Sequence, residues 1–138
     1  MSKALNYLGI SRMSGNIEIG EENTKELVKA GKARLLIVAS DTSDEAKRRA
    51  EGYIFGFSTL LAELPFTKAE LSQQLGRPGC SMAAIRDLGL AVSFAEALAA
   101  EHGERYQPLA DELKTKQQKI RTRKAAKGAK TGNRRNRE

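Results

Sequence analysis

The chain has 138 residues, of which 40% are hydrophobic, 5% are aromatic and none is tryptophan. One cysteine, Cys80, excludes an intramolecular disulfide, and one histidine, His102, leaves no set of ligands for a Cys/His zinc cage. Because no apolar stretch approaches the ~20 residues that span a bilayer and the start of the chain has no signal-peptide hydrophobic region, we expect a cytoplasmic protein with one folded domain and no cofactor.

Positive charge is concentrated at the C-terminal end of the chain. Residues 113–138 hold 11 Lys or Arg and one acid, a net charge of +10, whereas residues 1–112 hold 13 basic and 16 acidic residues, a net charge of −3. Such a basic segment buries too little surface to offset its own ordering, and nucleic acid is its commonest ligand. A solubilising tail without a target is the alternative. The predicted sequence-independent phosphate contacts are Lys119, Arg121, Arg123, Lys124, Lys127, Lys130, Arg134, Arg135 and Arg137.

The first half of the chain is predicted to alternate helices with short strands. An unbroken aliphatic run at 34–40 is the strongest strand signal, typical of a strand that is covered on both faces. Acids in the first turn after Gly20 and a glycine at position 31 indicate the two ends of a helix. The predicted elements are a helix at 5–13, a strand at 17–19, a helix at 21–30, a strand at 34–40 and a helix from 44 to between 53 and 55.

The second half continues the alternation. Thr67 and Glu70 have capping-box spacing, and Gly76 closes the helix that they begin. The predicted elements are a strand at 60–64, a helix at 67–75, a strand at 81–86 and a helix at 90–100. From 104 to about 127 the spacing of Leu109, Leu113 and Ile120 permits a helix, but a frayed, exposed extension is favoured for the isolated segment.

This alternation predicts an α/β domain with helices on both faces of a sheet. The predicted domain covers residues 1–103. Residues 104–138 are expected to form a basic C-terminal extension, disordered or partly helical.

Few residues favour an enzyme. Cys80 is the one conceivable thiol nucleophile and His102 its one possible base, but they lie in unlike segments, and a cysteine beside a loop is more often a small packing residue. The segment Gly76–Gly79 lacks the lysine and the spacing of a nucleotide-binding loop. Glu21 and Glu22 suit the start of a helix better than a metal.

Two places suit RNA. Gly20, between a strand and a helix, leaves backbone N–H groups at the helix start, where a phosphate or a base edge can bind. The loop Gly76–Cys80 has little side-chain bulk and can lie close to a nucleic acid. The alternatives are that Gly20 only closes a tight turn and that the loop only joins a helix to a strand.

Three segments, Leu8–Asn16, Gly20–Glu22 and Lys29–Asp41, resemble the YlxQ-like bacterial branch of the ribosomal protein L-seven-Ae superfamily. Leu71–Gly76 and Cys80–Ala91 keep the order of helix, loop, strand and last helix that is found in this family. The resemblance covers about residues 4–100.

The resemblance implies a three-layer α/β/α sandwich with a four-stranded mixed sheet, no catalysis, and binding of a kink-turn or similarly bent RNA in the bacterial translation machinery, with ribosomal RNA or ribosome-associated proteins as possible partners. It places the RNA contacts after the glycine that opens the second helix and in the loop before the last strand. The residues it assigns are Gly20, Glu21, Glu22, Asn23, Lys25, Glu26, Lys29 and Lys32 in the first patch, and Arg77, Pro78, Gly79, Cys80 and Ser81 in the second.

The chain departs from the pattern of kink-turn binders at three places. Glu22 and Asn23 stand in the reverse of the usual Asn-Glu order, Glu26 replaces a lysine, and Asn16 replaces another. A carboxylate at Glu26 repels a phosphate. The alternative function is therefore a protein-interaction module of the same fold that has lost specific RNA binding, with a tail that binds RNA non-specifically.

Overall fold

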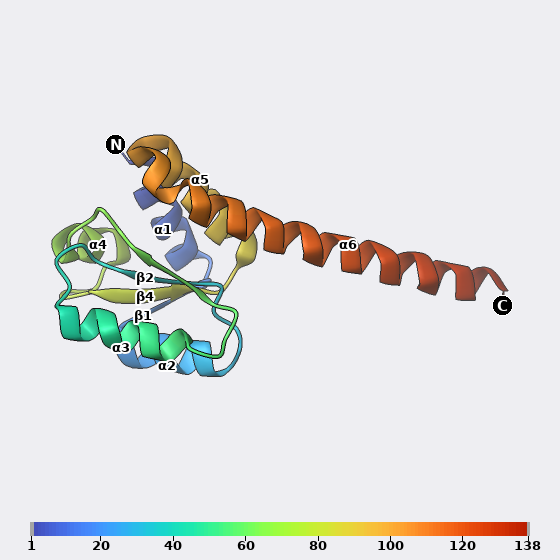
Figure 1. Ribbon diagram of the computed structural model, residues 1–138, viewed down its shortest axis with the longest axis horizontal. Helices are drawn as coiled ribbons and strands as arrows, with labels where there is room; N and C mark the ends of the chain where they lie inside the picture. The colour runs from blue at the N-terminus through green and yellow to red at the C-terminus, as the bar shows by residue number, and fades with distance from the viewer. Residues whose placement is uncertain (1, 138) are drawn as a thin grey trace.

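The computed structural model describes the backbone of residues 2–137 and the side chains of residues 2–124. Helices and strands alternate along most of the chain (Figure 1). The elements are α1 (Lys3–Met13), β1 (Ile17–Ile19), α2 (Glu21–Lys29), β2 (Leu35–Val38), α3 (Asp44–Ile54), β3 (Leu60–Glu63), α4 (Lys68–Leu75), β4 (Met82–Ile85), α5 (Leu88–His102), the 3-10 helix η1 (Gly103–Tyr106) and α6 (Gln107–Arg137).

The four strands form one mixed sheet in the order β1-β4-β2-β3. Strand β4 runs antiparallel to both of its neighbours, and β2 and β3 run parallel. Helices α2 and α3 cover one face, and α1, α4 and α5 lie on the other, so the predicted α/β sandwich is confirmed (Figure 1). Strands β1 and β2 finish where β4 begins, and we call this the Gly20 end of the sheet. Strands β2 and β3 begin at the opposite end.

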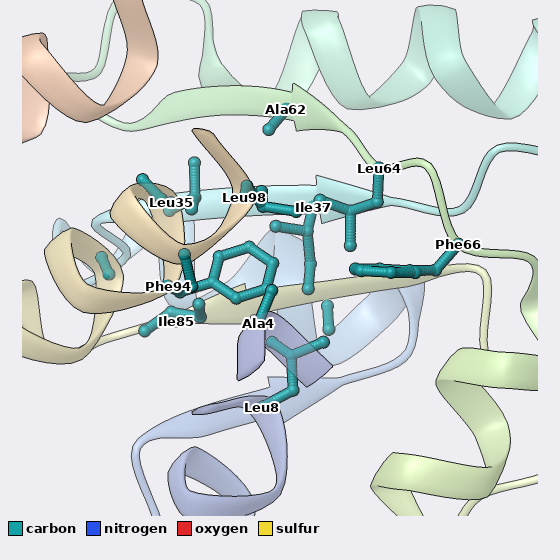
Figure 2. Packing of buried hydrophobic residues seen from close by; sticks show 14 of the residues in the cluster. Ala4, Leu8, Leu35, Ile37, Ala62, Leu64, Phe66, Ile85, Phe94 and Leu98 are labelled. Atoms are coloured by element: carbon teal, nitrogen blue, oxygen red, sulfur yellow. The ribbon is translucent and has the colours of Figure 1, made fainter. Parts of the chain in front are cut away.

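Alternate residues of the strands feed two hydrophobic cores. Leu35, Ile37 and Ile85 face α1 and α5, where they pack with Leu8 and Phe94 (Figure 2). Their neighbours in sequence, among them Leu36 and Val38, face α2 and α3. Burial of each large apolar side chain contributes about 1.5–3 kcal/mol. Strand β2 is buried along its whole length, as its unbroken aliphatic run predicts.

Capping residues set the helix boundaries. Thr67 and Glu70 form the predicted capping box at the start of α4, and Gly76 ends that helix in the left-handed conformation with φ +69°. Helix α5 begins at Leu88, two residues before the predicted start, because the carboxylate of Asp87 accepts a hydrogen bond of 2.8 Å from the backbone N–H of Leu90.

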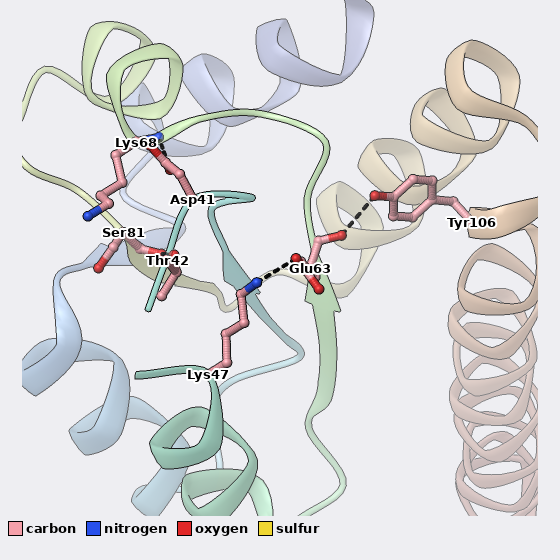
Figure 3. A network of polar contacts seen from close by, with 7 residues as sticks. All are labelled: Asp41, Thr42, Lys47, Glu63, Lys68, Ser81 and Tyr106. Carbon is pink, nitrogen blue, oxygen red and sulfur yellow. Dashed lines mark hydrogen bonds and ion pairs between the residues drawn. The ribbon is translucent and has the colours of Figure 1, made fainter. Parts of the chain in front are cut away.

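The hydrophobic core continues beyond residue 103, the expected end of the domain. Tyr106, Ala110 and Leu113 are buried in the same core as Phe94. The hydroxyl of Tyr106 also donates a hydrogen bond of 2.8 Å to the backbone oxygen of Glu63, whose carboxylate pairs with Lys47 (Figure 3). Residues 107–137 form a helix, which is one of the two states expected for the C-terminal extension, and its first turns pack on α5.

Helix α6 then leaves the rest of the molecule as a long arm (Figure 1). Within the described part of the chain, no helix is both long enough and apolar enough to cross a bilayer.

Candidate nucleic-acid interface

The two segments singled out in the sequence meet at the Gly20 end of the sheet. The side-chain amide of Asn23 donates a hydrogen bond of 3.0 Å to the backbone oxygen of Ile19, and the guanidinium of Arg77 donates one of 3.4 Å to the same oxygen. The N–H of Gly20 donates to the backbone oxygen of Met82, at the start of β4, over 2.9 Å. The start of α2 and the loop before β4 therefore form one surface.

The backbone at Gly20 opens α2 without a side-chain cap. Its φ of +97° and ψ of 155° are accessible almost only to glycine. No side chain of the described residues caps this helix start. The N–H groups of residues 21–23 therefore stay available to a phosphate or a base edge, and the helix dipole favours a negative charge there.

The loop between α4 and β4 is fixed at its base. The N–H of Cys80 donates a hydrogen bond of 3.0 Å to the hydroxyl of Ser72. The backbone oxygen of Ser81 accepts from the N–H of Ala39 at 2.9 Å and from the hydroxyl of Thr42 at 3.3 Å; the side chains of Thr42 and Ser81 lie side by side in Figure 3.

The tip of this loop, residues 76–79, is exposed. It includes Arg77, Pro78 and Gly79 of the predicted second patch, and Gly79 has a φ of +69°. A base or a phosphate can approach this tip closely because it has few bulky side chains.

Cys80 lies inside the core. Only 4% of the residue is exposed, its thiol donates to the backbone oxygen of Met82 at 3.7 Å, and burial raises the pKa of the thiol. His102 packs edge-on against Phe66 and Tyr106. A thiol with a raised pKa is a poor nucleophile at neutral pH, so this geometry favours the packing role for Cys80.

Glu21 is turned toward α3. Its carboxylate forms a bidentate pair with Arg49, with N–O distances of 2.6 and 3.1 Å, and accepts a hydrogen bond from the hydroxyl of Tyr53. The hydrogen bond from Arg49, followed by that from Tyr53, lowers the pKa of Glu21. Lys25 lies nearby with its ammonium 5.7 Å from the ring centre of Tyr53. These two members of the predicted first patch thus join α2 to α3.

The remaining members of the first patch lie at several places on α2 and just after it. Asn23, Glu26 and Lys32 line a shallow hollow beside β1, together with Glu18 and Arg86. Glu22 and Lys29 are exposed. The structure therefore brings Gly20 and Asn23 to the loop that carries Arg77, while the other charged residues of α2 are spread around the helix.

One cation near this surface is missed by the sequence analysis. A methyl group placed on Gly76 would lie 2.7 Å from a guanidinium nitrogen of Arg12, so the end of α1 lies against the loop. Arg12 is exposed. Nothing in the sequence marks it, because the contact depends on how α1 packs on α4.

The basic residues of α6 lie away from the Gly20 end. Lys116 donates a hydrogen bond to the backbone oxygen of Ser58, in the loop before β3 at the opposite end of the sheet. From there α6 leads outward (Figure 1). Of the predicted phosphate contacts, the exposed side chains are Lys119, Arg121, Arg123 and Lys124. Those outside the described side chains are Lys127, Lys130, Arg134, Arg135 and Arg137.

Among the described side chains, no three His, Cys, Asp or Glu residues form a group that could hold a metal ion. The surface at the Gly20 end offers backbone N–H groups, an amide and guanidinium groups. These groups suit phosphates and base edges.

Comparisons with known proteins agree with the fold. No protein-family profile matches the chain. The chain is 32% identical over 76 residues to the RNA-binding protein YlxQ of Enterococcus faecium, and the match covers 55% of this chain and 73% of that protein.

Two solved structures are similar in shape. A protein of unknown function from Bacillus halodurans superposes with a TM-score of 0.66 at 19% identity, over 71% of this chain and 98% of that one. The 15.5 kD RNA-binding protein of Giardia lamblia superposes with a TM-score of 0.57 at 20% identity, over 70% of this chain and 82% of that one. At these identities, the likeness shows a shared fold.

Proposed function

The chain belongs to the family of the RNA-binding protein YlxQ, and from this premise we propose that it binds folded RNA with a sharp bend, of the kink-turn type, at the Gly20 end of its sheet. The observation that carries the proposal is the shared acceptor of Asn23 and Arg77, the backbone oxygen of Ile19. This contact joins two short, shape-reading segments into one surface. A bent RNA offers its phosphates and unstacked bases to such a surface, whereas a straight duplex does not.

Each group at this surface has a distinct role in the proposal. The free N–H groups at the start of α2 donate hydrogen bonds to a phosphate or a base edge. Asn23 pairs with a purine edge through its amide, and residues 78–81 pack under an unstacked base. Arg77 and Arg12 supply positive charge close to the loop. In this proposal, the two guanidinium groups replace the lysines that kink-turn binders carry at the positions of Asn16 and Glu26.

The basic part of α6 adds affinity that does not depend on sequence. Lys119, Arg121, Arg123 and Lys124 are exposed on a helix that leaves the domain. Cations on such an arm contact phosphates without choosing among them. We place the protein in the bacterial cytoplasm, where structured RNA of the translation machinery, including ribosomal RNA, is the candidate target.

A second candidate function is suggested by α2. Glu22 and Glu26 are exposed, and the ion pairs found among the described residues include neither of them. An acidic helix face of this kind suits a basic protein surface. In this alternative the domain binds another protein, and α6 alone binds RNA.

Binding to two matched RNAs separates the candidates. One RNA contains a kink-turn, and the other is a straight duplex of the same length and charge. Titrations across a range of salt concentrations should give tighter binding to the bent RNA at every concentration, because shape recognition adds to the shared electrostatic attraction. Equal affinities for both RNAs at all salt concentrations would remove the domain from RNA recognition and favour the protein-interaction candidate.

A further inference from the structure

Two aromatic rings are exposed at the end of the sheet opposite Gly20. Phe55 is 87% exposed and Phe57 is 42% exposed. Both lie in the turn between α3 and β3, on either side of Gly56. Large apolar side chains that remain in solvent at neighbouring positions mark a surface that meets a partner.

The turn that carries the rings is held in place. The N–H of Phe57 donates a hydrogen bond of 2.9 Å to the backbone oxygen of Ile54, and Gly56 adopts a φ of +84°. On the far side of the rings, the buried hydroxyl of Thr59 donates to the backbone oxygen of Ala33 at 2.8 Å. The rings are therefore presented from a defined backbone, which lowers the entropy lost when a ligand binds.

A positive charge contacts the turn that carries the rings. The ammonium of Lys116 on α6 donates to the backbone oxygen of Ser58, next to Phe57. Lys119 and Arg123 follow at spacings of three and seven residues, so that they share one face of the helix with Lys116. The acids closest in sequence, Glu51 on α3 and Glu112 on α6, are exposed. Toward the C-terminus of α6, the helix face that carries Lys116 therefore presents further positive charges.

We propose that this surface, formed by Phe55, Phe57 and the Lys116–Arg123 face of α6, binds an unpaired RNA segment. The two rings stack on bases, while the cations contact the phosphates that follow along the strand. An aromatic platform next to a basic track is the arrangement that binds single-stranded nucleic acid without reading its sequence. The adjacent cations favour RNA as the ligand over an apolar protein surface, because phosphates can pair with the cations and an apolar surface cannot.

This inference rests on the proposed function, since it assigns the same class of ligand to a second place. Because the two surfaces lie at opposite ends of the sheet, they would bind separate parts of one RNA: the bend at the Gly20 end, and a flanking single strand at Phe55 and Phe57. Linked binding of this kind raises the overall affinity without new contacts at either place.

The test uses tryptophan as a reporter of stacking. The chain contains three tyrosines but no tryptophan, so Phe55→Trp introduces a single tryptophan into the full-length protein, and its fluorescence can be excited selectively. Oligouridylate and a kink-turn RNA with a single-stranded oligouridine extension should quench its fluorescence, whereas the same kink-turn RNA without the extension should leave it nearly unchanged. Met13→Trp is the matched control, because Met13 is 84% exposed on α1 and should report no quenching by the oligouridylate.

A second measurement compares affinities. Replacing both Phe55 and Phe57 by Ala should weaken binding to the extended kink-turn RNA by about 10-fold or more, the size expected for loss of a stacked base. Affinity for the unextended RNA should not change. Unquenched Phe55→Trp at saturating oligouridylate, or equal losses for both RNAs, would overturn the proposal. So would a dimer of the wild-type chain that the double variant abolishes. Failure of every RNA to bind would instead reject the proposed function itself.

Discussion

Asn23 and Arg77 donate hydrogen bonds to the same backbone oxygen, that of Ile19. Asn23 lies in the first turn of α2, and Arg77 lies in the loop that leads into β4. The shared acceptor exists because β1 and β4 are neighbours in the sheet, with Ile19 opposite Ala83. The two side chains are therefore fixed by the sheet itself, and a ligand that contacts one of them lies within reach of the other.

Substitution of either residue should reduce selectivity more than it reduces affinity in general. Asn23→Ala and Arg77→Ala are each expected to weaken binding to a kink-turn RNA by about 10-fold, as for the loss of one or two hydrogen bonds to a charged group. Binding to a straight duplex should change little. Lys124→Ala, which removes an exposed cation of α6, should weaken both by the same small factor. Parallel losses for all three variants would mean that charge alone governs binding.

Gly20→Ala should destabilise the fold, although a methyl group there would contact no atom within 4 Å. The cause is the backbone conformation with a φ of +97°, which costs a residue with a side chain about 1–3 kcal/mol. Gly52→Ala is the matched control, since Gly52 lies inside α3 with open space around it. Alanine there should stabilise the protein by about 0.5–1 kcal/mol. Urea denaturation of both variants gives the comparison, and a neutral Gly20→Ala would contradict the described turn.

Truncations should separate the structural part of α6 from its basic part. Deletion of residues 119–138 removes nine Lys and Arg but leaves Tyr106, Ala110 and Leu113 in the core. The shortened protein should unfold at nearly the same temperature. Its RNA affinity should also depend less on salt. The slope of log affinity against log salt concentration should become less steep by up to about 6 to 8, if all nine removed cations contact phosphates. An unchanged slope would show that the arm makes no phosphate contacts.

Deletion from residue 104 onward should have a different effect. It exposes the part of the core that Tyr106 and Leu113 cover, so we expect a large loss of stability or failure to fold. Leu113→Ala is the milder test, and the cavity that it leaves should cost about 2–5 kcal/mol. A fully stable Leu113→Ala would indicate that the start of α6 does not pack on α5.

The pair between Glu21 and Arg49 should make stability depend on pH in the acid range. Hydrogen bonds from Arg49 and Tyr53 lower the pKa of Glu21 below its ordinary 4.5. A carboxyl group with a depressed pKa stabilises the folded state above its unfolded pKa, and this contribution disappears as the pH falls through the folded pKa. Glu21→Gln should therefore be less stable than the wild type near pH 7, and the difference should shrink as the pH falls below 4.5, the ordinary pKa of the group, and vanish once the pH lies below its lowered folded pKa. Thermal melts of both proteins from pH 3 to pH 7 provide the measurement.

The thiol of Cys80 should react slowly while the protein is folded. Burial raises its pKa, and the thiolate is the reactive form. A disulfide reagent at pH 7 should label Cys80 in urea much faster than in buffer, and the rate in buffer should rise only at a pH above the ordinary pKa of a thiol. Rapid labelling in buffer would place the thiol at the surface.

Local sequence signals predicted most of the fold. The aliphatic run of β2, the capping box at Thr67 and Glu70, and the glycine after α4 each depend on residues close in sequence, and each is found in the structure. The first turns of α6 could not be predicted in the same way. Their apolar residues stabilise a helix only when α5 covers them, and the surface of α5 is a product of the whole fold.

The candidate interfaces were predictable only in part. Gly20 and the loop at 76–81 are marked by glycines, but their contact through Ile19 depends on strand order. Glu21 carries no sign of its pairing with Arg49, since that contact arises from the packing of α2 on α3. The exposed rings of Phe55 and Phe57 carry no sequence signal of their own, because an exposed aromatic residue cannot be told from a core residue by type alone.

The length of α6 has a kinetic consequence. Leu113 is the last fully buried residue among the side chains that the structure describes in this helix, and the helix backbone runs on to Arg137, about 36 Å at 1.5 Å per residue. An arm of this length can meet RNA molecules within a much larger volume than the domain alone occupies. RNA captured by the arm also remains at a high local concentration around the rest of the molecule. The arm should therefore act mainly on the rate of association, while the residues around Gly20 determine how long a correctly shaped RNA stays bound.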